Sequence, residues 1–276
     1  MSNARPGEAR ASGPSVADTL VNDPQAAPEP LLQQSYDFLG DGDIDCERYT
    51  SQAFFRRELE QVWARCWQWA CREEHIPEEG DTYVYNIGPY SVIVVRDAAD
   101  SISAFMNSCT HRGTRILDGE GVGYSPQFTC PFHGWSWHLD GRLKAIPGGW
   151  DFPHAGEASH SLQRVACDTW GGFVFVNMDP DAAPLAEYLD VLPEHFRHFP
   201  LERRRIRAHV QKILPANWKA AQEAFMEAYH NFETHDSPNG ANAQYDIFGK
   251  YVSRFIHTNG QYLSLIHISE PTRQES

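Results

Sequence analysis

Four residues in two short stretches have the types and the spacing of metal ligands. Cys109 and His111 lie two positions apart in SCTHRGTR, and Cys130 and His133 lie three positions apart in CPFHGWSW. Gly or Pro in each stretch predicts a loop between strands, which can direct its ligands inward. Two thiolates and two imidazoles suit a structural tetrahedral zinc, or a 2Fe–2S cluster with two Cys on one iron and two His on the other.

The order of these ligands along the chain favours the iron–sulfur cluster. Zinc fingers commonly present paired cysteines and then paired histidines. Here each loop supplies one cysteine and one histidine, so each loop can contribute to both irons. Zinc stays open as an alternative at this point, and the metal content of the purified protein would separate the two.

A second set of ligand-type residues lies in NWKAAQEAFMEAYHNFETH, residues 217–235. Glu227 and His230 are three positions apart and would share one face of a helix. The carboxylate could then hold one imidazole nitrogen and fix the tautomer of the ring. His230 and His235 are five positions apart, so they converge only if the helix bulges or ends between them. For that pair alone, two unrelated histidines are the simpler interpretation.

The two loops together resemble a known family. CTHRGTR and CPFHGWSWHLDG are similar to the Rieske signature in the large (alpha) subunits of aromatic ring-hydroxylating oxygenases that contain non-haem iron. The resemblance implies that Cys109 and Cys130 bind the inner iron of a Rieske 2Fe–2S cluster, and that His111 and His133 bind the outer iron. Imidazole ligands raise the reduction potential above that of an all-cysteine cluster, so the cluster can store an electron from a reduced partner.

The stretch from Asn217 to His235 resembles the mononuclear iron motif of the same family, carboxylate-x2-His-x4-His after Asn-Trp-Lys. The resemblance implies that His230 and His235 bind an Fe(II) whose open positions take dioxygen. It also implies that Glu227 is the carboxylate that connects an iron-binding His to a cluster-binding His of a neighbouring subunit. Asn217 would approach the iron.

The third iron ligand of the family is an Asp far downstream, which we expect to be absent from this chain. Asp236 is adjacent to His235 and poorly placed, and Asp246 in YDIFG is expected in a turn. The final residues, SLIHISEPTRQES, resemble a translated sequencing adapter rather than a continuation of the preceding pattern. We therefore expect a C-terminally truncated subunit.

The resemblance implies the terminal oxygenase component of a multicomponent system. Electrons from NAD(P)H would arrive through a reductase, with or without a ferredoxin. Dioxygen would be used to hydroxylate an organic substrate, which we expect to be aromatic. A homotrimer or an α3β3 assembly is implied. Two alternatives stay open: a Rieske electron-transfer protein or inactive oxygenase fragment without chemistry of its own, and a structural zinc-binding domain. The truncated chain is expected to bind its cluster and to lack oxygenase activity.

The fold class expected from these patterns is α+β. An all-β Rieske domain would be followed by the first part of a catalytic domain with an antiparallel sheet and helices. The expected divisions are a disordered leader at 1–30, a helical segment at 31–66, the Rieske domain at 67–180, a partial catalytic domain at 181–262 and a non-native tail at 263–276.

Several local elements can be predicted as well. TYVYNI and SVIVVR are predicted to form a hairpin through Gly88 and Pro89. A helix with Thr50 or Ser51 as cap is predicted to carry Phe55, Leu59, Val62 and Trp63 on one face. Helical patterns recur between residues 184 and 196. A strand is expected at 205–213, because Ile206, Ala208 and Val210 alternate with Arg205, Arg207 and His209. A longer helix is expected from about residue 217 into the 230s.

The composition argues against nucleic acid and membrane partners. The 276 residues carry a formal net charge of −14, whereas nucleic-acid binding depends on Lys and Arg that neutralise phosphates. No apolar run reaches the length of a membrane span, and no signal-peptide segment is recognised, so we expect a cytoplasmic protein. The four other cysteines, Cys46, Cys66, Cys71 and Cys167, are then expected to be structural thiols rather than disulfides.

Overall fold

The computed structural model describes residues 16–21, 24–33, 42–227, 230–234, 243–248, 251–259 and 262–266. These residues form three antiparallel sheets and short helices, which confirms the α+β class. The largest sheet has seven strands in the order β1-β10-β9-β4-β3-β2-β5. Its strands are β1 (Gln68–Arg72), β2 (Asp81–Ile87), β3 (Tyr90–Ala98), β4 (Ser101–Met106), β5 (Gly121–Tyr124), β9 (Arg164–Trp170) and β10 (Phe173–Asn177).

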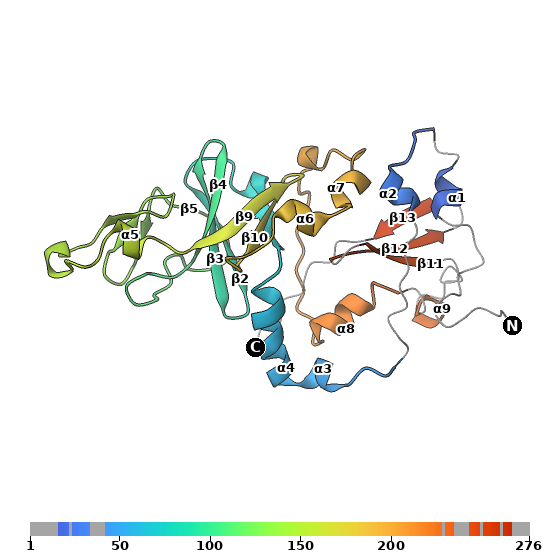
Figure 1. The fold of residues 1–276 in the computed structure, drawn as a ribbon, viewed down its shortest axis with the longest axis horizontal. Helices are drawn as coiled ribbons and strands as arrows, with labels where there is room; N and C mark the ends of the chain where they lie inside the picture. The colour runs from blue at the N-terminus through green and yellow to red at the C-terminus, as the bar shows by residue number, and fades with distance from the viewer. Residues whose placement is uncertain are drawn as a thin grey trace.

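Two smaller sheets accompany the large one: one is inserted in the chain between β5 and β9, and the other follows β10. The first contains β6 (Phe128–Thr129), β7 (Ser136–Trp137) and β8 (Leu143–Ala145), and the second contains β11 (Ala243–Phe248), β12 (Val252–Asn259) and β13 (Tyr262–Ile266). In Figure 1 the second small sheet lies at the opposite end of the molecule from α5 (Glu157–His160). The large sheet lies between them.

Strand β3 is a central strand with both faces covered. Val92, Ile93, Val94 and Val95 are each 0% exposed. Because side chains alternate along a strand, Ile93 and Val95 join one core and Val92 and Val94 join another. The core on the side of Ile93 also contains both predicted cysteine ligands. The predicted hairpin of β2 and β3 is confirmed, and it supports the ligand loops on one of its faces.

The turn between β7 and β8 requires glycine at position 141, because the backbone there lies very close to the core that contains Ile93. Gly141 has a φ of 84°, and a Cβ there would collide with the ring of the buried Phe105. Gly119 has a similar φ of 81°, with nothing within 4 Å of a built Cβ. The two glycines therefore share the same backbone requirement and differ only in crowding.

We expect Gly141→Ala to destabilise the protein more than Gly119→Ala. Both variants bear the strain of a left-handed backbone, roughly 1–2 kcal/mol, but only Gly141→Ala adds overpacking, about 1–3 kcal/mol. Urea unfolding measures the difference in the free energy of unfolding. Equal losses for the two variants would show that the Phe105 ring moves aside without cost.

The helix predicted after Ser51 begins as expected and then changes its pitch. Three elements follow one another here: α3 (Glu47–Thr50), α4 (Gln52–Glu58) and a π-helical turn, η1 (Leu59–Trp63). The Ser51 hydroxyl accepts a hydrogen bond from the Phe54 amide at 3.3 Å and caps α4 as predicted. A π turn rotates the side chains that follow it. Val62, predicted for the apolar face, is therefore 42% exposed, while Trp63 is buried.

Residues 205–213 do not form the predicted strand, so that prediction is wrong. A short 3-10 turn, η4 (Leu201–Arg203), is followed by irregular chain as far as α8 (Trp218–Glu223). Val210 and Ile213 are 87% and 68% exposed. Alternation is typical of a half-buried strand, but a strand also needs a hydrogen-bonded neighbour. No strand within the described ranges pairs with this segment.

The helices on either side of this segment are short. The helical pattern between residues 184 and 196 is confirmed by α6 (Leu185–Leu189) and α7 (Leu192–His195). The long helix predicted from about residue 217 is instead broken. Asn217 caps α8, which ends at Glu223, and α9 (Asn231–Thr234) is a separate turn of helix. Hydrogen bonds of the turn type at residues 225 and 226 replace the helical ladder after α8.

The described part of the N-terminal region contains structure that the composition did not predict. Two short helices, α1 (Val16–Leu20) and α2 (Glu29–Leu32), occur where a disordered leader was expected. Arg254 of β12 donates hydrogen bonds to the carbonyls of Pro30 and Leu31, both at 3.1 Å, and forms an ion pair with Asp246 at 2.8 Å. Asp246 is thus a buried strand residue and not the turn residue that we predicted.

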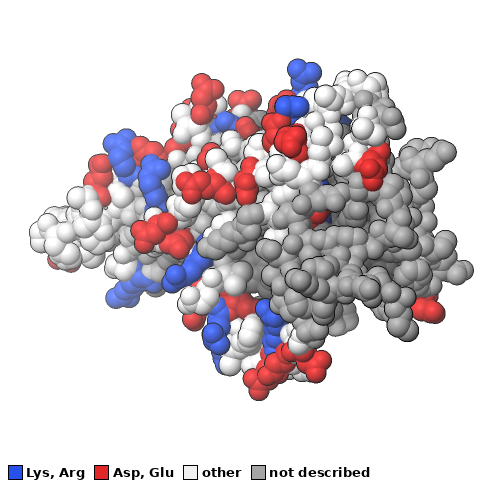
Figure 2. Space-filling model, turned by 45° about the vertical axis from the view of Figure 1, so that its right-hand side comes forward, with Lys and Arg blue, Asp and Glu red and all other residues white. Residues whose placement is uncertain are grey.

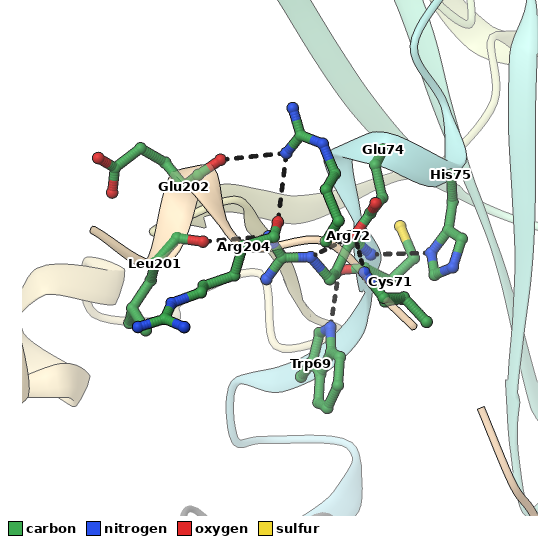
Figure 3. Close-up of polar contacts among 10 residues, drawn as sticks. Trp69, Cys71, Arg72, Glu74, His75, Leu201, Glu202 and Arg204 are labelled. Carbon is green, nitrogen blue, oxygen red and sulfur yellow. Dashed lines mark hydrogen bonds and ion pairs between the residues drawn. The ribbon is translucent and has the colours of Figure 1, made fainter. Parts of the chain in front are cut away.

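A buried arginine at the end of β1 attaches the large sheet to the segment that leads to α8. Arg72 is 5% exposed, and its Nε donates to Glu74 at 2.8 Å. Its Nη2 donates to the carbonyls of Leu201 and Arg204 at 3.2 and 2.9 Å, as Figure 3 shows. The guanidinium lies 4.4 Å from the centroid of the Phe173 ring. The chain beyond Leu201 therefore leaves from a fixed point on the sheet.

The described surface carries charges of both signs. On the face drawn in Figure 2, Lys and Arg side chains are interspersed with Asp and Glu side chains. Such a mixed surface differs from the basic stripe by which proteins neutralise nucleic-acid phosphates. Among the described helices, none combines the length and the apolar character needed to cross a membrane.

Candidate metal centres

The two predicted ligand loops adopt the same turn conformation. The amide of Cys109 donates to the carbonyl of Thr114 at 2.8 Å, and the amide of Cys130 donates to the carbonyl of Trp135 at 2.8 Å. In each loop the glycine four residues after the cysteine donates back to the cysteine carbonyl, at 2.8 and 3.0 Å. These glycines have φ values of 75° and 74°. Two equivalent turns therefore present two cysteine–histidine pairs to each other.

The structure places the two sulfur donors next to each other and the two imidazole rings next to each other. Cys109 and Cys130 are 4% and 2% exposed, and their thiols form a hydrogen bond with each other. The rings of His111 and His133 lie with their centroids 4.8 Å apart. Sulfur thus faces sulfur and imidazole faces imidazole. This pairing fits a two-iron cluster with two Cys on one iron and two His on the other.

The two thiols differ electrostatically, although each accepts hydrogen bonds from two amides of its own loop. Burial raises the pKa of Cys109, and the thiol hydrogen bond to Cys130 adds to the increase. Burial also acts to raise the pKa of Cys130, but amides of Phe132 and His133 and the Cys109 thiol donate to this sulfur and lower its pKa overall. Metal ligands must be thiolates. Donors already directed at the sulfur favour that form.

The first imidazole is held by aromatic rings and keeps one nitrogen for a ligand bond. His111 stacks on Trp135 with an interplanar angle of 3° at 4.9 Å, and Phe152 contacts the edge of its ring at 5.9 Å. Burial lowers the pKa of His111, and the nearby His133 and Arg112 charges lower it further, so the ring is held neutral. Its Nδ1 is buried and has no hydrogen-bond partner in the part of the chain that is described. A buried, unpaired nitrogen of this kind is well suited to bind a metal.

The second imidazole of the pair lies at the surface. His133 is exposed, and the ring of Phe132, itself 61% exposed, lies 4.0 Å from it between centroids. Arg112 and Arg115 are exposed on the other loop. The two histidines therefore differ: His111 is partly buried, with its Nδ1 atom fully covered, whereas a partner could reach His133.

The other cysteines lie apart from this centre. Burial raises the pKa of Cys66 to about 11 and that of Cys167 to about 12, and it raises the pKa of Cys71 as well. Thiols of this kind remain protonated and are inert. Cys46 is exposed. All six cysteines are free thiols.

In the second predicted centre, Glu227 and His230 are in contact. The Glu227 carboxylate accepts hydrogen bonds from the His230 amide at 3.0 Å and from His230 Nδ1. Because a carboxylate only accepts, Nδ1 carries the proton in this contact, and in a neutral ring Nε2 would then have the lone pair that a metal ligand needs. This contact has the geometry that the predicted role of Glu227, orienting the imidazole, would need. His235 lies outside the described residues.

Asn217, the other described residue predicted for the second centre, and Asp246, which was expected in a turn, both have other partners. The Asn217 side chain caps α8 by accepting from the Lys219 amide at 2.9 Å, and it donates to the carbonyl of Tyr49 at 2.8 Å. Asp246 pairs with Arg254 instead. Within the described ranges, no three His, Cys, Asp or Glu side chains are arranged around a single metal ion.

Two residues near this second centre were not predicted from the sequence. Glu58 and Lys219 form a buried ion pair between α4 and α8, with 2.6 Å between Oε1 and Nζ. Lys219 belongs to the quoted Asn-Trp-Lys motif, which is the only signal that could have indicated it. Glu58 is one of several charged residues in its helix, and the sequence does not distinguish it from the exposed ones.

Comparison with known proteins identifies the domain that contains the first centre. The profile of the Rieske [2Fe-2S] domain matches residues 66–155, which include all four predicted ligands. The chain is 34% identical over 196 residues to the biphenyl 2,3-dioxygenase subunit alpha of Rhodococcus jostii and 35% identical over 196 residues to the benzene 1,2-dioxygenase subunit alpha of Pseudomonas putida. This chain is a homologue of the alpha subunits of Rieske aromatic ring-hydroxylating dioxygenases.

The homology covers part of each protein. Both alignments include 68% of this chain, but they span 42% and 43% of the two relatives. Among solved structures, naphthalene 1,2-dioxygenase with indole bound is 32% identical, with a TM-score of 0.58 over 66% of this chain and 42% of that one. A quaternary ammonium Rieske monooxygenase in complex with L-carnitine is 25% identical, with a TM-score of 0.64 over 75% and 60%. This chain therefore comprises a Rieske domain and part of a catalytic domain.

Proposed function

We propose that this chain is the N-terminal portion of the large subunit of a terminal Rieske oxygenase that hydroxylates an aromatic substrate. The observation that carries the proposal is the pairing of Cys109 with Cys130 and of His111 with His133 on two equivalent loops of a Rieske domain. The contact of Glu227 with His230 supports a second iron centre. The relatives named above act on biphenyl and benzene, which supports an aromatic substrate.

The residues of the first centre have separate roles in this proposal. A Rieske cluster held by these four ligands supplies reversible one-electron storage. Trp135 and Phe152 fix the ring of His111 and exclude water from its buried side. The amides directed at Cys130 sulfur stabilise negative charge on it. His133 is the ligand through which an electron would leave toward a neighbouring subunit, because it is exposed.

In the second centre the chain orients a histidine. A mononuclear Fe(II) held by His230 and His235 would supply the site for dioxygen. Glu227 keeps the proton of His230 on Nδ1, so that Nε2 points its lone pair away from the carboxylate. We propose the same Glu227 as the group that joins this histidine to the cluster ligand of a neighbouring subunit, in a homotrimer or α3β3 assembly. Reductase or ferredoxin donors would deliver the electrons.

Iron and sulfide content test this proposal directly. Anaerobically purified and reconstituted protein should contain about two irons and two acid-labile sulfides per chain in the Rieske domain, as a 2Fe–2S cluster requires. The reduced protein should give the EPR signal of a cluster with mixed Cys and His ligands. A colourless protein with one zinc per chain and no sulfide would favour the structural zinc domain and reject the oxygenase.

A second candidate, an electron-transfer domain without oxygen chemistry of its own, is favoured by one observation. Within the described ranges, no group of three His, Cys, Asp or Glu side chains could hold a single iron. Chemically reduced, iron-loaded protein can be exposed to oxygen with indole as probe. Electron loss from the cluster without an oxidised indole product would support this candidate for the chain as it stands.

A further inference from the structure

A buried ion pair joins the N-terminal helical region to the segment that carries Glu227 and His230. Glu58, at the end of α4, and Lys219, in the first turn of α8, approach to 2.6 Å between Oε1 and Nζ. Their side chains are 7% and 9% exposed. In Figure 1, α4 and α8 lie side by side below the sheets. Two helices whose paired residues are 161 positions apart in sequence are thus joined by one buried charged contact between Nζ and the carboxylate.

Further contacts around the ion pair fix the rotation of α8 about its own axis. The Trp218 indole donates to the second oxygen of Glu58 at 3.3 Å, so the carboxylate holds both of the first residues of α8. The Trp218 ring meets Trp63 of η1 at 5.0 Å with an interplanar angle of 69°. The Lys219 ammonium lies 5.7 Å from the centroid of the Tyr49 ring. Rotation of α8 would break the ion pair, the indole hydrogen bond and the ring contact together.

The same helical region also contacts both ends of α8. Asn217, the cap of α8, donates to the carbonyl of Tyr49 at 2.8 Å. The Tyr49 hydroxyl donates to the carboxylate of Glu223 at the other end, 3.0 Å from each oxygen. These two contacts are partly exposed, whereas the Glu58–Lys219 pair is buried. The ion pair is therefore the least solvent-screened of the attachments.

Backbone hydrogen bonds transmit the position of α8 to Glu227. The amides of residues 224, 225 and 226 donate to the carbonyls of residues 220, 222 and 223, at 3.3, 2.9 and 2.9 Å. Glu227 follows directly after this last turn. The Glu227 carboxylate then meets the His230 amide and Nδ1. A shift of the start of α8 would consequently displace the carboxylate relative to the imidazole.

We propose that the Glu58–Lys219 ion pair is a positioning element for the second metal centre, which holds α8 in the rotation that brings Glu227 onto His230. The assignment of a metal to His230 rests on the proposed function, but the contact with Glu227 does not. Breaking a buried pair leaves an uncompensated charge, which the protein relieves by moving one helix toward water. The contact between Glu227 and His230 is lost as α8 moves.

The tautomer of His230 reports this contact without any metal. Ring-nitrogen NMR of histidine-labelled full chain at about pH 8, where histidine is neutral, distinguishes Nδ1–H from Nε2–H. In the native chain His230 has its proton on Nδ1. In Glu58→Gln and in Lys219→Met, the ratio of Nδ1–H to Nε2–H should fall about tenfold or more, as expected for loss of a charge-assisted hydrogen bond. Lys219→Arg keeps the charge and should retain the native ratio.

A matched buried pair supplies the control. Asp246 and Arg254 are 6% exposed each and lie in the sheet of β11 to β13. Asp246→Asn should lower the unfolding midpoint without changing the His230 tautomer, whereas Glu227→Gln should change the tautomer with the midpoint intact. If Glu58→Gln does not fold, Glu58→Asp replaces it and should shift the ratio in the same direction by less.

Two results would overturn the positioning role. One is a native tautomer ratio in folded Glu58→Gln, Glu58→Asp and Lys219→Met chains. The other is an equal change in Asp246→Asn, which would show that general destabilisation suffices. Neither result affects the iron and sulfide content, which tests the oxygenase proposal separately.

Discussion

The Cys130→Ser variant should bind no 2Fe–2S cluster. Cys130 is 2% exposed and is the sulfur to which the loop amides and the Cys109 thiol are directed. Its replacement leaves three ligands and offers a hydroxyl oxygen in place of a soft thiolate, which Fe–S clusters require. The brown colour, the acid-labile sulfide and the EPR signal of the reduced protein should all disappear after anaerobic reconstitution.

Cys71→Ser is the matched control for this experiment. Cys71 is also 2% exposed, but it lies in β1, and burial raises its pKa. The control should keep the full cluster content, with some loss of stability from a buried hydroxyl. Unchanged spectra in Cys130→Ser, or equal cluster loss in both variants, would refute the assignment of Cys130 as a ligand.

The Arg72→Met variant should lower the free energy of unfolding by about 1–3 kcal/mol, the range for leaving hydrogen-bonding groups without their partner. Methionine fills a similar volume beside the Phe173 ring. It leaves the Glu74 carboxylate and the carbonyls of Leu201 and Arg204 without their donor. Urea unfolding measures the loss. Trypsin should also cleave faster at the arginines of residues 203–207, because their attachment to the sheet is gone.

Arg142→Met is the exposed counterpart. Arg142 lies 2.7 Å from Asp140, but the two side chains are 58% and 36% exposed. Solvent screens such pairs, so the unfolding midpoint should change little. If Arg72→Met behaved like Arg142→Met, in both unfolding and proteolysis, the fixed exit of the chain from the sheet would not depend on Arg72.

Much of the first centre could be predicted from the sequence because it is local. Cysteine and histidine two or three positions apart, with a glycine two or one residues later, specify a turn whose ligands converge without help from distant residues. The hairpin of β2 and β3 is equally local, since a turn at Gly88 and Pro89 sets its register. The family profile covers both loops, and the structure places the rings of His111 and His133 side by side.

Predictions that depended on partners distant in sequence were less accurate. The alternation in residues 205–213 indicated a strand, but a strand forms only where another strand pairs with it. Asp246 resembled a turn residue because its partner Arg254 could not be identified from the pattern. Val62 was placed on the apolar face because a regular helix was assumed, and the π turn rotates it outward.

The sequence by itself determined the ligand types, their grouping into two loops, and the β-rich class of the domain around them. Only the tertiary structure decided which partners the buried charges meet across the fold: Glu58 with Lys219, Arg72 with the carbonyls of Leu201 and Arg204, and Arg254 with Asp246. The physical reason is that a short turn is specified by neighbouring residues, whereas the pairing of a buried charge depends on which helices and strands meet. A local sequence pattern therefore predicts a turn, but it does not predict the partner of a buried charge.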